Sequence, residues 1–216
     1  SYLIKEHFSG NTKTIKDEYK ENCSYVNLVD MLDFNRVEFS KAINLSINKK
    51  VEIESKYPLV KLGEYCENIT KGTTPTTLGF DFINRGINFI KIESILQDGN
   101  YDKSKFAFIN EECNQKMLRS QLKKNDILFS IAGALGRTAI VSDDILPANT
   151  NQAISIIRLK LNTNFKLNYL YQVLRGNIIQ SQIDGLKVGI AQPNLSLTQI
   201  GNFKIPLPPL EIQEEI

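Results

Sequence analysis

The stretch DILFSIAGALGRTAIVSDDILPANTNQAISIIRLKL, residues 126–161, decides the fold of this 216-residue chain. It contains three apolar runs, at residues 127–131, 138–141 and 153–161. Short runs that are rich in β-branched residues and bounded by Gly, Pro, Asn and Asp are typical of strands joined by tight turns. We therefore predict three strands here, which form the core sheet of the protein.

Two connections within this stretch carry side chains suited to nucleic acid. Residues 132–137 contain two glycines and end in Arg137, at the lip of the turn, and residues 149–152 read Asn-Thr-Asn-Gln. Asn, Gln and Arg can form bidentate hydrogen bonds with base edges when loops present them. The stretch therefore predicts a recognition module with two contact loops.

Other segments predict the elements that hold this sheet. Asn110 is expected to cap a helix that runs to about residue 120, and Gly72 is expected to supply an unusual backbone dihedral angle. The glycine-bracketed segment 185–192 is expected to be a loop. Further helices are predicted at residues 62–66, 167–175, 178–183 and 197–200, and extended segments at 69–75, 87–92, 106–109 and 203–209.

Composition restricts the classes of function. The chain is 42% hydrophobic, so it can bury a full core, and its formal net charge is only +2. No basic tail indicates nucleic-acid binding. A DNA-binding surface would therefore depend on where the charged side chains lie. This balance leaves a protein-interaction module open as an alternative.

Several chemistries lack the residues that they need. Three distant cysteines form no CxxC pair, which predicts reduced thiols in a cytoplasmic protein. A single histidine argues against imidazole-based hydrolysis, and no Asn/Asp-Pro-Pro-aromatic motif of an adenine methyltransferase occurs. No apolar run approaches the length of a membrane helix. We therefore predict no catalytic residue, metal site or cofactor site in this fragment, and no membrane contact.

Short motifs spread over residues 57–216 resemble one target recognition domain of the specificity subunit of type I restriction-modification systems. They are, in order, YPLVKLGE (57–64), GTTP (72–75), FIKI (89–92), LKKNDIL (122–128), GALGR (133–137), NQA (151–153), NLS (194–196) and IPLPPLEIQ (205–213).

The resemblance implies an α+β (mixed α/β) fold, a compact globule with a twisted, mostly antiparallel sheet and peripheral helices. It implies a recognition domain at residues 57–209 and the start of a truncated spacer helix at 210–216. Residues 1–56 are then an N-terminal arm. Within it, residues 25–46 are similar to the connector that follows the methyltransferase part of fused, type IIG-like enzymes.

Candidate contact residues follow from the loops of this arrangement. Arg137 and Lys187 are the strongest single candidates for DNA contact. Turn capping is the alternative for each amide side chain, and a solvated surface is the alternative for the lysines. The full set is Lys71, Thr73, Thr74, Lys91, Ser94, Arg137, Asn149, Asn151, Gln152, Lys187 and Gln192.

The function that the resemblance implies is sequence-specific binding of double-stranded DNA, which directs methylation or cleavage by other domains or subunits. The expected partners are DNA, a methyltransferase domain or subunits, and a restriction subunit. S-adenosylmethionine and Mg²⁺ are expected only in those associated catalytic domains. The alternative is a scaffold module that docks methyltransferase subunits. A steep salt dependence of DNA affinity would separate the two.

Overall fold

The computed structural model describes residues 53–187 and 194–216, with the exception of the side chain of Lys187. The arm predicted for residues 1–56 therefore lies almost entirely outside the described residues. The predicted contact residue Gln192 lies outside them as well.

A four-stranded antiparallel sheet forms the centre of the domain, in the order β2-β8-β5-β6. Its strands are β2 (Cys66–Lys71), β5 (Ile127–Ser130), β6 (Thr138–Ile140) and β8 (Ile154–Leu159). The last three of these are the strands predicted from the stretch 126–161. Their β-branched residues suit a pleated surface that is buried on both faces.

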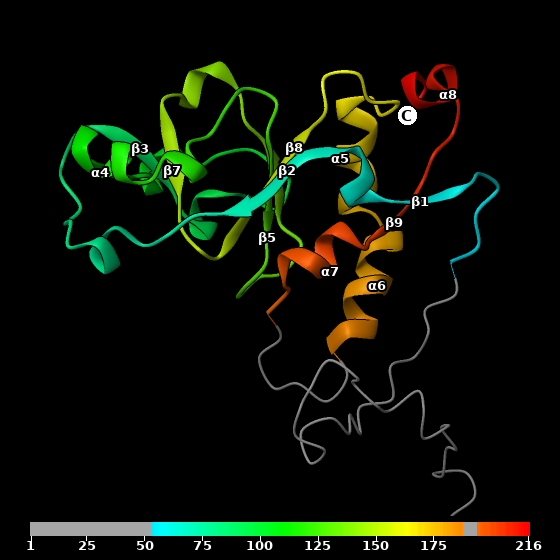
Figure 1. The fold of residues 1–216 in the computed structure, drawn as a ribbon, viewed down its shortest axis with the longest axis horizontal. Helices are drawn as coiled ribbons and strands as arrows, with labels where there is room; N and C mark the ends of the chain where they lie inside the picture. The colour runs from blue at the N-terminus through cyan, green and yellow to red at the C-terminus, as the bar shows by residue number, and fades with distance from the viewer. Residues whose placement is uncertain (1–52, 188–193) are drawn as a thin grey trace, which may run out of the picture. The chain divides into compact units, whose positions relative to one another are not determined.

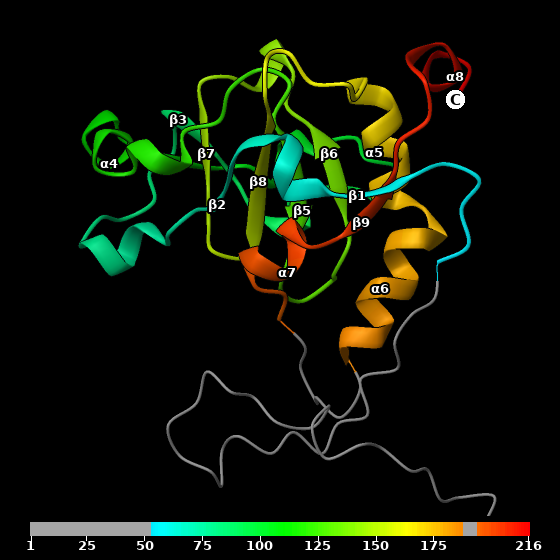
Figure 2. The same cartoon turned by 45° about the vertical axis from the view of Figure 1, so that its right-hand side comes forward.

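The two faces of this sheet carry different parts of the core. Phe129 and Ile157 face one cluster together with helices α5 (Leu167–Arg175) and α6 (Asn177–Lys187). Leu128 precedes Phe129 on β5, so its side chain points to the opposite face of the sheet, where it belongs to a second cluster. Figures 1 and 2 show α5 and α6 on one side of the sheet and β3, β7 and α4 on the other. The period-2 alternation of strand side chains explains this division.

A second sheet has the order β4-β3-β7, and β3 pairs antiparallel with β4 but parallel with β7. Its strands are β3 (Ile87–Ile90), β4 (Ala107–Ile109) and β7 (Ala148–Thr150). Strand β7 contradicts part of the predicted amide-rich loop, because residues 149 and 150 belong to a buried strand. The loop itself begins at Asn151.

Helix α4 (Glu111–Lys116) begins where the sequence predicts it. The Asn110 Oδ1 accepts a hydrogen bond from the Cys113 N–H at 2.8 Å and so caps the helix. Helix α5 and its end at Gly176 also agree with the prediction. Helix α6 is longer than predicted, since it includes residues 184–187, so the segment 185–192 is not a loop throughout. The Gly185 position does not end the helix.

The C-terminal part closes the domain with a small sheet. Strand β1 (Leu59–Lys61) pairs only with β9 (Lys204–Pro206), which confirms the edge position expected for a proline-rich strand. Helices α7 (Leu197–Gly201) and α8 (Leu210–Glu214) flank β9. Short 3₁₀ helices lie at Leu62–Tyr65, Pro75–Leu78, Ile92–Ser94, Lys103–Lys105, Leu118–Ser120 and Asp143–Ile145.

One ion pair is buried in the central sheet. The Asp126 carboxylate accepts hydrogen bonds from Arg158 Nε at 2.7 Å and from Arg158 Nη2 at 2.6 Å. It also accepts one from the Lys123 N–H at 2.7 Å. The side chain of Asp126 is 1% exposed, so these donors satisfy a carboxylate that solvent does not reach.

The fold class is confirmed as mixed α/β with mostly antiparallel sheets. In the described part of the chain, no helix is both long and apolar enough to cross a membrane. In the same ranges no group of three or more His, Cys, Asp or Glu side chains could hold a metal ion. Burial raises the pKa of the Cys66 thiol to about 12, so this thiol stays protonated at neutral pH.

Candidate nucleic-acid interface

Loops from both sheets meet where several strands begin or end. Strand β2 ends at Lys71 opposite Ser155, near the start of β8. Strands β3 and β7 are parallel and end side by side, with Ile90 opposite Thr150. We call this region the loop edge and define it as Lys71–Thr74, Lys91, residues 131–137, Asn151 and Gln152.

Two of the predicted contact loops touch each other at the loop edge. The Gly72 N–H donates to the Asn151 carbonyl oxygen at 3.1 Å. The Thr74 hydroxyl donates to the side-chain oxygen of the exposed Gln152. Predicted residues from segments about 80 positions apart in sequence therefore lie together.

Gly72 has a role that differs from the predicted one. Its backbone is not in the positive-φ region, so the expected unusual dihedral is wrong. A Cβ at this position would lie 1.7 Å from the Thr150 carbonyl oxygen. Glycine is therefore needed here because the first loop runs in close contact with the end of β7.

Lys91 follows directly after β3 and carries its charge over an aromatic ring. Its Nζ lies 4.3 Å from the ring centroid of Phe82, and Phe82 packs edge-on against the buried Phe89 with their centroids 5.3 Å apart. A cation above a ring face is attracted by the ring quadrupole. Phe82 is a residue of this region that the sequence analysis missed, since a single phenylalanine in a loop carries no distinctive signal.

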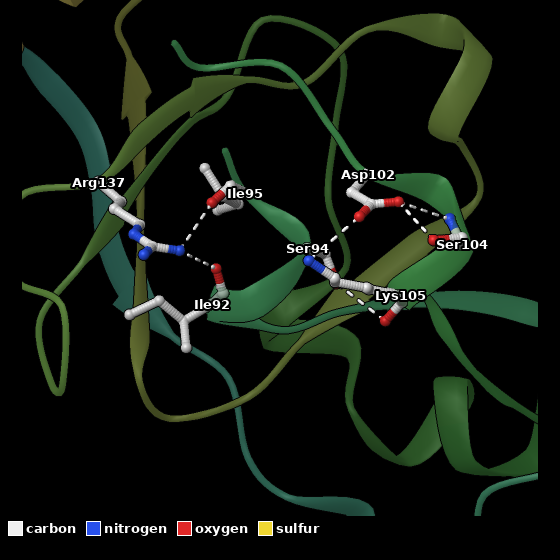
Figure 3. A network of polar contacts seen from close by, with 7 residues as sticks. All are labelled: Ile92, Ser94, Ile95, Asp102, Ser104, Lys105 and Arg137. Atoms are coloured by element: carbon white, nitrogen blue, oxygen red, sulfur yellow. Dashed lines mark hydrogen bonds and ion pairs between the residues drawn. The ribbon is translucent and has the colours of Figure 1, made fainter. Parts of the chain in front are cut away.

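Arg137 lies at the loop edge as predicted, but its guanidinium group contacts protein. Its Nη1 donates to the Ile95 carbonyl oxygen at 3.1 Å and to the Ile92 carbonyl oxygen at 3.4 Å, as Figure 3 shows. The side chain is half-buried. The guanidinium group therefore ties the turn after β5 to the segment that follows β3.

Two other candidates are completely buried. The Ser94 hydroxyl donates to the Lys105 carbonyl oxygen at 3.1 Å. The Asn149 side-chain nitrogen donates to Asn114 Oδ1 at 3.0 Å and to the Met117 carbonyl oxygen at 3.2 Å. Both side chains use their polar atoms inside the domain, and neither reaches the surface in this structure.

The remaining predicted contact residues differ in whether their side chains cap a turn or are exposed to solvent. The Asn151 Oδ1 accepts from the Ala153 N–H at 3.0 Å, which is the turn-capping alternative. Thr73 is half-buried, whereas Lys71 is exposed. Lys187 is the last residue of α6, and contacts by its side chain or by Gln192 stay predictions.

The surface near residues 102–144 holds several ion pairs between lysines and carboxylates. There, Lys103 pairs with Asp144 at 2.7 Å and Lys105 with Asp102 at 3.2 Å. Hydrogen bonds from Ser104 and then Lys105 hold the pKa of Asp102 below its usual range. In contrast, neither Lys71 nor Lys91 has a carboxylate partner among the residues that the structure describes. Their charges are available to an anionic ligand.

The fold is a mixed α/β domain in which several of the predicted contact loops lie at one end of the sheets. Residues 54–216 match the type I restriction modification DNA specificity domain. Because this match covers more than half of the chain, the chain belongs to that family.

Two relatives agree with this membership. The chain is 32% identical over 181 residues to the EcoBI type I restriction enzyme specificity subunit of Escherichia coli, covering 79% of this chain and 37% of that protein. It is 27% identical over 187 residues to the MjaX type I restriction enzyme specificity subunit of Methanocaldococcus jannaschii, covering 83% and 42%. The chain therefore spans about two fifths of the length of these relatives.

The fold is also similar to the crystal structure of the HsdS subunit from Thermoanaerobacter tengcongensis. The TM-score is 0.56 at 20% identity, over 77% of this chain and 41% of that chain. A second structure, from work on complex assembly and conformational transition of the type I R-M system, gives a TM-score of 0.51 at 19% identity, over 79% and 39%. These two likenesses support the fold.

Proposed function

We propose that this chain is a DNA-reading domain of a type I restriction-modification system and that its loop edge contacts the duplex. The observation that carries the proposal is the convergence of the two predicted loops, joined by the Thr74–Gln152 hydrogen bond, beside two lysines that pair with no carboxylate in the described part of the chain. Membership in the DNA specificity domain family supports it and does not favour the scaffold alternative.

The loop edge offers groups for both kinds of DNA contact. Lys71 and Lys91 would neutralise phosphates, which supplies affinity without sequence information. Gln152 is exposed, and its amide nitrogen has no hydrogen-bond partner among the described residues, so it offers donors to base edges. The Thr74 hydroxyl would orient that amide before DNA arrives.

The chemistry itself would take place on other polypeptides or domains. We propose that methyltransferase and restriction subunits, or fused domains, supply S-adenosylmethionine and Mg²⁺ sites. This domain would recognise one part of the DNA target sequence. Two such domains would recognise the two halves of a split target.

A binding selection from randomised duplex DNA, repeated at two salt concentrations, tests the proposed function. We expect enrichment of a short sequence motif and an affinity that falls steeply as salt rises, because bound lysines release counterions from phosphates. Recovery of random sequences at both salt concentrations, with the chain folded, would contradict sequence reading by this domain. Gln152→Ala serves as the matched variant and is expected to relax the motif at one position.

A further inference from the structure

Main-chain N–H groups are exposed in the turn between β5 and β6. Gly133 and Ala134 are exposed, and Ala132 is half-buried. Among the residues that the structure describes, none accepts a hydrogen bond from the N–H groups of Ala132, Gly133 or Ala134. Three successive donors in one turn of the loop edge therefore have no acceptor within residues 53–187 and 194–216.

The backbone of this turn includes two glycines in the left-handed conformation that anion-binding turns contain. Gly133 has a φ of 68° and Gly136 a φ of 83°, both in the left-handed region. Successive N–H groups around a left-handed residue form a concave nest that binds anions. Main-chain N–H groups are also regular partners of DNA phosphates.

Ser130 holds the turn from within. Its hydroxyl donates to the Ala134 carbonyl oxygen and accepts from the Arg137 N–H, the latter at 2.8 Å. The Gly136 N–H donates to the Ser130 carbonyl oxygen at 3.1 Å. These bonds involve Ser130, Ala134, Gly136 and Arg137, and none of them uses the N–H groups of Ala132, Gly133 or Ala134.

Arg137 links the same turn to the segment 92–95 that follows β3. Its guanidinium group binds the carbonyl oxygens of Ile92 and Ile95, and Ser94 between them is fixed in turn by Lys105 and Asp102 (Figure 3). The position of a Cβ on Gly133 would lie 3.8 Å from Ile92 Cδ1. The turn therefore lies next to the segment that begins with Lys91.

We propose that this turn binds a DNA phosphate through the N–H groups of Ala132, Gly133 and Ala134, and that Arg137 is a positioning residue for it. The inference rests on the proposed contact between the loop edge and DNA. Arg137 holds the turn in place and does not itself pair with a phosphate. Lys91, without a carboxylate partner, supplies the positive charge nearby.

The amide signals of the turn give a direct test in the ¹⁵N-labelled chain with a short duplex of mixed sequence. Hydrogen bonds to phosphate are expected to shift the amide protons of Gly133 and Ala134 downfield. Binding of the duplex without these shifts would overturn the proposed phosphate site. A mixed sequence is chosen because phosphate contacts do not depend on sequence, so the site can be confirmed even if no motif is enriched by selection.

Arg137→Gln tests the positioning role. We expect the DNA affinity to fall about tenfold and the downfield shifts to disappear. The slope of log affinity against log salt should stay unchanged, because no phosphate-neutralising cation is lost. A slope reduced by about 0.9 would show that Arg137 pairs with a phosphate itself and would overturn the assignment. Faster hydrogen exchange in residues 131–137 reports the loosened turn without DNA.

Arg175→Gln is the matched control. Arg175 Nη2 also donates to a main-chain carbonyl oxygen of the same segment, that of Gln97 at 3.0 Å, but it does so from α5. We expect this variant to keep the wild-type affinity and amide shifts. An equal loss in both variants would mean that the segment after β3, and not the turn, governs binding, and would overturn the role assigned to Arg137.

Wild-type chain that binds no duplex at either salt concentration would contradict the phosphate site together with the proposed function.

Discussion

The buried carboxylate of Asp126 shows how a single residue supports the central sheet. Its two oxygens accept from Arg158 at 2.6 and 2.7 Å while the side chain is 1% exposed. Removal of one member of a buried pair leaves the other charged group without a partner in a site poor in water. At the residue scale, then, few positions outside the apolar core should affect stability as strongly.

We expect Asp126→Ala to lower the free energy of unfolding by about 3 kcal/mol. The matched control is Asp143→Ala, because Asp143 pairs with Lys124 at the surface, where both side chains are more than half exposed. That variant should cost less than about 1 kcal/mol. Urea unfolding followed by circular dichroism measures both, and similar losses in the two variants would contradict the role given to burial.

At the element scale, helices begin where local side chains satisfy free N–H groups. Asn110 caps α4, and Ser196 with Gln199 forms a reciprocal capping box at α7. The cap at Asn110 was predicted from sequence, because the capping residue lies three positions from its partner, whereas only the start of α7, and not its capping box, was predicted. The end of α6 was not predicted, since Leu186, which lies beyond Gly185 in the helix, packs against the core cluster that faces the sheet.

Asn110→Ala is expected to destabilise the domain by about 1 kcal/mol, because the N–H of Cys113 loses its acceptor. Asn110→Ser should lose much less, since a serine hydroxyl can accept the same bond. Thermal unfolding of the two variants beside wild type provides the measurement. Equal melting temperatures for alanine and serine would show that the cap does not contribute.

At the scale of the whole molecule, the placement of charge matters more than its sum. The formal net charge is +2, and part of the positive charge near residues 102–144 is paired, because Lys103, Lys105 and Lys124 each contact a carboxylate. In the described ranges Lys71 and Lys91 form no such pair, so an anionic duplex at the loop edge would meet two unpaired lysines. Composition alone could not show this distribution, because it depends on which residues the fold brings together.

Lys71→Gln tests whether the exposed lysine at the end of β2 contacts a DNA phosphate. We expect the slope of log affinity against log salt to fall by about 0.9, the value for one lost phosphate contact. Lys103→Gln is the control, since Lys103 is also exposed but pairs with Asp144 at 2.7 Å. Filter binding over a series of salt concentrations gives both slopes. An unchanged slope for Lys71→Gln would place that lysine outside the interface.

The sequence by itself determined the local features of this protein. Apolar runs predicted β5, β6 and β8, helical spacing predicted α5, and the capping residue Asn110 predicted the start of α4. Each of these depends on residues that are close neighbours in the chain. The order of motifs along residues 57–216 also indicated the family, which the match over residues 54–216 confirms.

Only the tertiary structure decided which polar side chains remain available to a ligand. Asn149 and Gln152 look alike in sequence, yet one is buried in β7 and the other is exposed beside Thr74. Arg137 was predicted to face DNA, but carbonyl groups more than 40 residues away hold its guanidinium group. Such partners are set by parallel pairing and by sheet packing, which join segments that no local pattern connects.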